Sequence, residues 1–94
     1  MASILRSQLP KSVKEIRFQF DSSFKPMNDF IKQTYPKIKS SNPNLPILIR
    51  PLNSISEPRC FVRLENGVEK RLGLNLFKSH EEIESNLSNL IQSS

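Results

Sequence analysis

The sequence predicts one small α/β domain in which a four-stranded mixed sheet carries two helices on one face, with the element order β-α-β-β-β-α. Three observations lead to this fold class. Apolar and polar residues alternate over 13–20, which is typical of a half-buried strand, and apolar residues recur at helical spacing over 27–38 and over 83–91. An Asn-Gly pair at 66–67 lies between two short β-prone runs, which is typical of a hairpin.

The first helix contains an expected weak point. Helical spacing extends this helix over about residues 24–40, soon after the strand at 13–20. Pro36 lies inside the helix, and a proline in a helix interior removes one backbone hydrogen bond. We therefore expect a kink or a restart near Tyr35.

The next run, LPILIR at residues 45–50, follows a turn-rich stretch and has the composition of a buried strand. A strand, a helix and a second strand in succession favour a parallel pair joined by a right-handed crossover. Since two helices can cover only one face of four strands, we expect the other face of the sheet to be bare or covered by a partner.

The register of the hairpin follows from the pairing of its side chains. With a two-residue loop, Leu64 would lie opposite Glu69, which is an unfavourable match. A three-residue loop over 65–67, with Gly67 left-handed in a bulge, pairs Leu64 with Val68 instead. The sequence therefore predicts the bulged hairpin.

The last helix begins with a capping box. Ser79 has the chemistry of an N-cap, and Glu82 follows it three residues later. The apolar residues from Ile83 to Ile91 then share one stripe of a helix.

Residues 1–12 are predicted to form an N-terminal tail, and residues 13–94 the single domain. The opening stretch 1–14 has no acidic residue and carries Arg6, Lys11 and Lys14, which is the composition of a mitochondrial targeting segment, although an uncleaved tail fits as well. The longest strictly apolar run, Ile47–Ile49, is far shorter than the roughly 20 residues of a membrane-spanning helix, so no direct membrane span is expected.

Composition excludes most catalytic and cofactor sites. One cysteine and one histidine can form neither an internal disulfide nor a structural zinc site, and both glycines lie at the hairpin rather than in a phosphate-binding loop. Cys60 is in phase with the apolar residues of its strand, so we expect a buried thiol. His80 is expected to be exposed in the first turn of the last helix. No cofactor and no metal is predicted.

The net charge of +5 is concentrated in the first half of the chain. Residues 1–50 hold nine Lys/Arg against three Asp/Glu, whereas residues 51–94 hold five against six. This bias suggests an acidic partner surface, a nucleic acid or an anionic lipid. Because the chain has no dense basic cluster, scattered solubilising charge explains the bias equally well.

Strand parity assigns a set of mostly charged residues to the uncovered face of the sheet. Arg17, Phe61, Arg63 and Arg71 are the candidates for a partner interface, because arginine and aromatic side chains are favoured in protein contacts. An ordinary solvated sheet face is an equally open alternative. The full set predicted for this face is Glu15, Arg17, Gln19, Phe61, Arg63, Glu69 and Arg71.

Three stretches carry a resemblance to a known family: VKEIRFQF at 13–20, FIKQTYPKIK at 30–39 and NPNLPILIRP at 42–51. Together they resemble a small accessory subunit of the alpha subcomplex of mitochondrial NADH:ubiquinone oxidoreductase, respiratory complex I. That family has a thioredoxin-like fold and is related to certain mitochondrial ribosomal proteins. The predicted element order is similar to the thioredoxin-like fold with its middle helix missing.

The resemblance also has local implications. In thioredoxins a cis-proline introduces the third strand, so the resemblance makes Pro58 a candidate for a cis bond with Glu57, with the trans bond as the open alternative. Members of the complex I family often have cysteines where this chain has Asp21 and Leu52. Regulation through a cysteine pair is therefore not expected here.

For function, the resemblance implies a non-catalytic accessory subunit that docks onto other subunits of complex I, peripherally on the matrix side of the mitochondrial inner membrane. It implies no small-molecule substrate, no cofactor and no nucleic acid. One alternative is a mitochondrial ribosomal protein of the same fold that binds rRNA through its basic first half. A second alternative is a single-thiol redox enzyme that uses Cys60.

Overall fold

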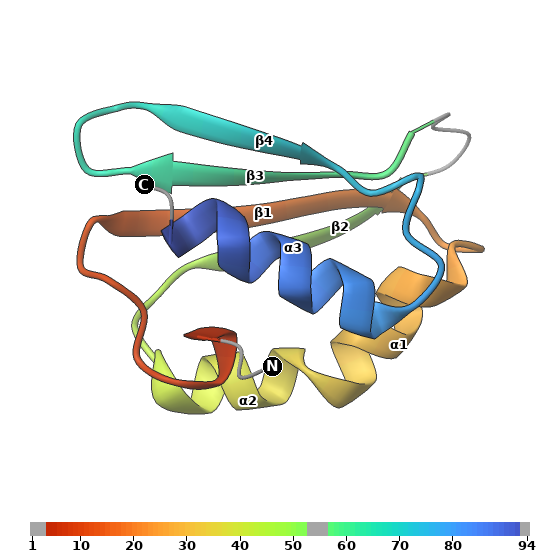
Figure 1. Cartoon of the computed structure of the whole chain (residues 1–94), viewed down its shortest axis with the longest axis horizontal. Helices are drawn as coiled ribbons and strands as arrows, with labels where there is room; N and C mark the ends of the chain where they lie inside the picture. Colours follow the sequence, from red (N-terminus) through yellow and green to blue (C-terminus); the bar gives the residue numbers. More distant parts are fainter. Residues whose placement is uncertain (1–3, 53–56, 93–94) are drawn as a thin grey trace.

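The helices in the described part of the protein lie on one face of a four-stranded sheet (Figure 1). The structure, a computed structural model, describes residues 4–52 and 57–92. In chain order its elements are the 3-10 helix η1 (Ile4–Arg6), β1 (Val13–Asp21), α1 (Lys25–Gln33), α2 (Tyr35–Ser41), β2 (Ile47–Leu52), β3 (Arg59–Leu64), β4 (Glu69–Gly73) and α3 (His80–Gln92).

The sheet has the strand order β2-β1-β3-β4. Strand β1 pairs in parallel with β2 and antiparallel with β3, and β3 pairs antiparallel with β4. The mixed four-stranded sheet predicted from the sequence is therefore confirmed. Because the helices gather on one face, the opposite face of the sheet is uncovered by any described segment (Figure 1).

The predicted first helix is in fact two helices, α1 and α2, which meet at Thr34. The Thr34 N–H donates to the Phe30 carbonyl (2.9 Å), and the Thr34 carbonyl accepts from the Lys37 N–H (3.0 Å). Pro36 lies in the first turn of α2, where its missing N–H leaves no intrahelical bond unmade. The restart near Tyr35 is thus confirmed, and the described chain has three α-helices rather than two.

The covered face of the sheet carries the core. Alternation along β1 directs Ile16, Phe18 and Phe20 toward the helices, and each is almost fully buried. The Phe18 ring packs against the Phe30 ring of α1, with the ring centroids 5.4 Å apart. Burying a side chain of this size stabilises the fold by about 1.5–3 kcal/mol.

The N-terminal segment also contributes to the core. Leu5 is fully buried and Leu9 is nearly so. Asn42, at the end of α2, fixes the segment from one side: its Oδ1 accepts the Leu9 N–H (2.9 Å) and its Nδ2 donates to the Ser7 carbonyl (3.0 Å). The packed domain therefore extends to residues before 13, where the sequence predicted a tail. The prediction missed this contribution because so short a segment has no detectable helical or strand period.

An ion pair joins the same segment to α3. Arg6 Nε and Nη2 donate to the two carboxylate oxygens of Glu84 at 2.8 and 3.0 Å, and Thr34 Oγ1 donates to Oε1 at 3.3 Å. Glu84 is buried, and its hydrogen bonds with Arg6 raise the pKa of the guanidinium above its usual value. Because Arg6 and Glu84 are 78 positions apart, no local sequence pattern signals the pair.

Strand β2 lies at an edge of the sheet. The strand predicted for this run is confirmed, over Ile47–Leu52, but Ile47–Ile49 are half-buried and Arg50 is exposed, so its predicted burial is wrong. The apolar residues of this run instead lie on both faces of an edge strand, and the helices cover only one of these faces. Pro51 fits such a position, because an edge strand tolerates a residue without an N–H.

The hairpin between β3 and β4 has the three-residue loop. The Leu64 N–H donates to the Val68 carbonyl at 2.8 Å. Gly67 has a φ of 82°, a left-handed conformation that glycine adopts without strain. Below the loop Arg63 pairs with Glu69, so the register derived from side-chain pairing is confirmed.

The bond between Glu57 and Pro58 is trans, as are the other peptide bonds between described residues. The cis bond suggested by the resemblance to thioredoxins is therefore wrong. Trans is the preferred form of an X-Pro bond by about 0.5–1 kcal/mol. Pro58 itself is buried, and its carbonyl accepts the Leu74 N–H at 2.9 Å.

The start of α3 resembles the predicted capping box with one difference. Ser79 Oγ accepts the Glu82 N–H at 3.3 Å, as an N-cap does. The Glu82 carboxylate accepts the N–H of Lys78 rather than that of Ser79. The Glu82 carboxylate thus accepts a backbone N–H one residue before the N-cap, whereas in a standard capping box it accepts the N–H of the N-cap itself.

Candidate docking surface on the sheet

The uncovered side of the sheet is rich in arginine, and we call it the arginine face. Five of the six arginines of the chain occupy it. Their side chains alternate with core residues along the same strands, so strand parity positions them. The face comprises Glu15, Arg17, Gln19 and Asp21 of β1, Leu48, Arg50 and Leu52 of β2, Arg59, Phe61 and Arg63 of β3, and Glu69 and Arg71 of β4.

Cross-strand pairing arranges these residues in rows that run across the sheet from β2 to β4. The first row consists of Leu48, Arg17, Phe61 and Arg71. The second row consists of Arg50, Gln19, Arg59 and Gly73. Neither row contains an acid; the acids Glu15 and Glu69 flank Arg63 in the neighbouring row.

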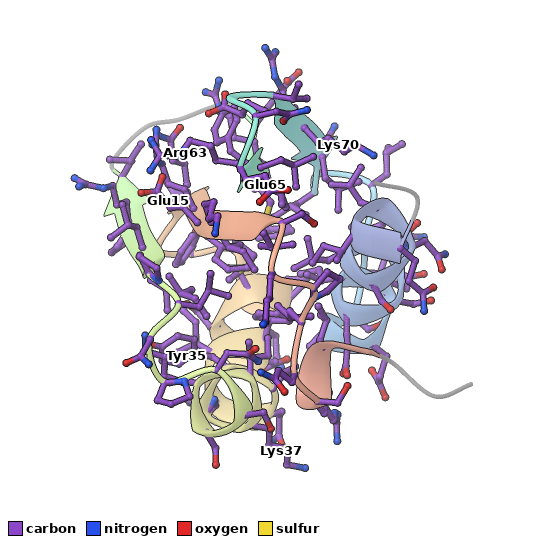
Figure 2. All side chains as sticks on the ribbon, turned by 90° about the vertical axis from the view of Figure 1, so that its left-hand side faces the viewer. Glu15, Tyr35, Lys37, Arg63, Glu65 and Lys70 are labelled. Atoms are coloured by element: carbon purple, nitrogen blue, oxygen red, sulfur yellow. The ribbon has the colours of Figure 1, made fainter. Side chains whose placement is uncertain are left out.

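Glu15 binds two of the arginines. Its carboxylate lies 2.8 Å from Arg17 Nη2 and 3.7 Å from Arg63 Nη2, and 15% of its side chain is exposed. Figure 2 shows Glu15 and Arg63 next to each other on the uncovered side of the sheet, whereas Tyr35 and Lys37 lie on the side of the helices. Ion pairs near the surface contribute only about 0–1 kcal/mol to stability, so the main effect of Glu15 is to orient the two guanidinium groups.

An aromatic ring lies at the centre of the first row. The Arg71 guanidinium stands over the Phe61 ring, with its Cζ 5.8 Å from the ring centroid, which is within the range of a cation–π interaction. Phe61 is half-buried, in part because neighbouring side chains lie against it. The pair presents a positive charge and an apolar surface together, which is a common combination in protein interfaces.

Two arginines of this face carry hydrogen-bond donors without an acceptor. Arg17 Nε and Arg59 Nε are buried, and neither has a hydrogen-bond partner among the described residues. Leaving a buried donor unsatisfied costs about 1–3 kcal/mol. The two residues are diagonal neighbours in adjacent rows, and other side chains cover both Nε atoms.

The four predicted interface residues, Arg17, Phe61, Arg63 and Arg71, lie together on adjacent strands of this face. The prediction missed five further residues of the face. Parity along the strands of Arg17 and Phe61 could have found two of them, whereas the other three depend on the parallel register between β1 and β2, which no local pattern determines. The missed residues are Asp21 and Arg59, and Leu48, Arg50 and Leu52.

Cys60 lies on the opposite, covered side of the sheet. It is fully buried, and burial raises the pKa of its thiol well above the usual value. A buried thiol that stays protonated is neither a good nucleophile nor accessible to a disulfide substrate. The position of Cys60 is therefore that of a small core residue, as its phase in the sequence predicts.

His80 is less accessible than the sequence predicts. Its side chain is 24% exposed, its Nε2 lies 3.6 Å from Glu81, and its Nδ1 is buried without a partner among the described residues. No group of three or more potential metal ligands occurs within residues 4–52 and 57–92. No helix in these ranges has the length and apolar character needed to cross a membrane.

Comparison with known proteins gives a consistent family. The model of the "Mitochondrial ribosomal protein L51 / S25 / CI-B8 domain" matches residues 27–75. The chain is 34% identical over 91 residues to NADH dehydrogenase (ubiquinone) 1 alpha subcomplex subunit 2 of Arabidopsis thaliana, which covers 94% of this chain and 92% of that protein.

Two further relatives carry related names. The chain is 34% identical over 85 residues to the NADH-ubiquinone oxidoreductase 10.5 kDa subunit of Neurospora crassa, covering 87% of this chain and 88% of that subunit. It is 40% identical over 55 residues to NADH dehydrogenase (ubiquinone) 1 alpha subcomplex subunit 2 of Mus musculus, covering 58% of this chain and 54% of that protein.

Proposed function

Since the chain belongs to the mitochondrial ribosomal protein L51 / S25 / CI-B8 domain family, we infer that it is an accessory subunit of mitochondrial respiratory complex I. The observation that carries this inference is the similarity to two complex I subunits along nearly the whole chain, in a plant and in a fungus. These full-length similarities favour complex I over the ribosome, although the family description covers ribosomal proteins as well.

The subunit acts by docking onto other complex I subunits rather than by chemistry of its own. Its single thiol lies in the core with a raised pKa, which argues against the redox enzyme considered from the sequence. The exposed residues that gather in one place are arginines around an aromatic ring. We assign the docking contact to this arginine face, with Arg17, Phe61, Arg63 and Arg71 as its centre.

The domain is a thioredoxin-like scaffold without the middle helix. In support, a parallel β1–β2 pair is followed by an antiparallel β3–β4 hairpin and a final helix. Only residues 53–58 separate β2 from β3, too few for a helix with its turns. Without that helix, one face of the sheet remains available for a neighbouring subunit.

The subunit is associated peripherally with the inner membrane through complex I, on the matrix side. This placement rests on the relationship to complex I subunits and on the resemblance of the three sequence stretches described above. Native-gel separation of mitochondrial complexes tests the proposal. A tagged copy of the chain should migrate with the NADH-oxidising band, and less complex I should assemble in cells that lack the chain. Migration only as a monomer, together with normal assembly in its absence, would overturn it.

A further inference from the structure

We propose that the arginine face binds an acidic segment of a neighbouring subunit, whose carboxylates pair with Arg50, Arg59 and Arg71. The inference rests on the proposed function and adds to it the chemistry of the partner. Its starting point is charge: the face carries five arginines against three acids, Glu15, Asp21 and Glu69.

The acids of the face leave three of its arginines without a counter-charge. Glu15 is shared by Arg17 and Arg63, and Asp21 Oδ1 accepts the N–H and the hydroxyl of Ser23 at 2.8 and 2.6 Å. Glu69 lies opposite Arg63 and forms no ion pair with a described residue. Among the described residues, the other three arginines form no ion pair. These three are Arg50, Arg59 and Arg71, of which Arg50 and Arg71 are exposed.

The unpaired arginines lie where one segment can reach them. Arg50 and Arg59 belong to the same row and are separated by Gln19 of β1, so their backbones are about 10 Å apart at a strand spacing of about 4.8 Å. Arg71 lies on the next strand, diagonal to Arg59. The position opposite Arg59 on that strand is Gly73, which places no side chain on the face. A carboxylate can therefore approach Arg59 from the β4 side.

Two unsatisfied donors lie in the same part of the arginine face and also favour a carboxylate partner. The Nε groups of Arg17 and Arg59 need an acceptor, and a carboxylate accepts from guanidinium groups through two oxygens at once. Charge-assisted bonds of this kind are roughly twice as strong as neutral ones. An acidic side chain seated above Arg59 would pair with a charge that the isolated domain leaves without a counter-charge.

The remaining residues of the face favour a protein over a nucleic acid. Leu48, Leu52 and Phe61 offer apolar surface to a partner, whereas Glu15 and Glu69 would repel a continuous phosphate backbone. The structure thus assigns to this surface a segment that mixes acidic and apolar residues.

Charge reversal with a matched control tests the proposal. Arg50→Glu/Arg71→Glu reverses two exposed, unpaired charges of the face, and Lys32→Glu/Lys37→Glu makes the same change in net charge on the helical side. Each protein is titrated into mitochondrial extracts from cells that lack the chain, and its incorporation into complex I is measured on native gels. The first variant should bind at least about tenfold more weakly, because attraction becomes repulsion, whereas the control should bind like the wild type. Thermal unfolding verifies that both variants fold.

A second variant identifies the partner. Arg50→Lys keeps the charge and supplies an amine that a carbodiimide couples to a nearby Asp or Glu, a link that the wild-type guanidinium does not form. A new amide link to an acidic segment of a complex I subunit supports the proposal, and the absence of any new link contradicts it.

Other outcomes are also decisive. If the wild type enters complex I and Arg50→Glu/Arg71→Glu enters equally well, the arginine face does not bind an acidic segment, while the proposed function stands. If the wild type fails to enter complex I, the proposed function itself is wrong. If nuclease treatment abolishes incorporation, the partner is RNA and the proposal is overturned.

Discussion

Two neighbouring residues of β1, Arg17 and Phe18, illustrate how differently the two faces of one sheet are built. Phe18 is buried against the ring of Phe30 beneath the helices. Arg17 points to the other side, where it is one-third exposed and pairs with Glu15. The covered face is built from apolar side chains that stabilise the fold, whereas the arginine face holds charges that contribute little to it.

This difference separates the folding of the domain from its proposed docking. Apolar burial on one side supplies most of the favourable free energy of folding, at about 25 cal/mol per Å². Ion pairs near the surface on the other side supply little. Substitutions on the arginine face should therefore change docking while leaving the domain folded. Substitutions on the covered face should lower the stability of the fold.

The largest expected effect comes from Phe18→Ala. Removal of a buried phenyl ring should lower the free energy of unfolding by about 3–5 kcal/mol, because it leaves a cavity beside Phe30. The adjacent substitution Arg17→Ala should cost less than about 1 kcal/mol. Urea unfolding monitored by circular dichroism measures both. Equal losses at the two positions would show that the faces do not differ in the way described.

The N-terminal segment provides a second test of what covers the core. Leu5→Ala should cost about 2–5 kcal/mol, because Leu5 is fully buried between the helices. Leu76→Ala is the matched control, since Leu76 is 82% exposed and its truncation should change stability by no more than about 0.5 kcal/mol. Thermal unfolding compares the two variants. A Leu5→Ala variant as stable as the control would mean that the segment does not belong to the core.

The hairpin loop determines which residues of β4 reach the arginine face. Gly67→Ala should cost about 1–2 kcal/mol, because an alanine with a φ of 82° is strained. Gly73→Ala should have almost no effect, since its backbone is not left-handed and the nearest atom to an added Cβ is Asn75 Oδ1 at 3.5 Å. Chemical denaturation of the two variants measures the difference, and similar values would contradict the bulged loop.

The smallest effect concerns an exposed ion pair on the helical side, which serves as a reference for the pairs on the arginine face. Lys25 Nζ lies 2.8 Å from Asp29 Oδ2, and this hydrogen bond lowers the pKa of Asp29. The associated stabilisation is present above the pKa of Asp29 in the unfolded chain and is lost as the pH falls through its lower pKa in the folded protein. Lys25→Gln should raise the pKa of Asp29 toward its ordinary value, as followed by NMR titration of the carboxyl carbon. An unchanged pKa would show that the pair does not form in solution.

Much of the fold could be predicted because its signals are local. The alternation of β1, the restart near Tyr35 and the left-handed Gly67 each depend on a few consecutive residues. The features that the sequence did not reveal depend on contacts between distant segments. The position of β2 at the sheet edge and the pairing of Arg6 with Glu84 are of this second kind.

The candidate surface was predicted in part for the same reason. Parity within β1 and across the hairpin placed Arg17, Phe61, Arg63 and Arg71 on one face. Arg50 was missed because its side depends on the parallel register between β1 and β2, which no local pattern determines. The trans bond at Pro58 shows that a feature of a broader fold family need not be present in each chain that resembles it.

Thiol labelling of the assembled complex tests the central claim most directly. Cys60 is buried, so a cysteine introduced at Gln19, in the middle of the arginine face, or at Asn89, on the exposed side of α3, is a site-specific probe. Alkylation at position 19 should be rapid in the isolated protein and strongly slowed within complex I, whereas position 89 should be slowed less. If position 19 reacts as fast in the complex as in the isolated protein, the arginine face is not the docking surface.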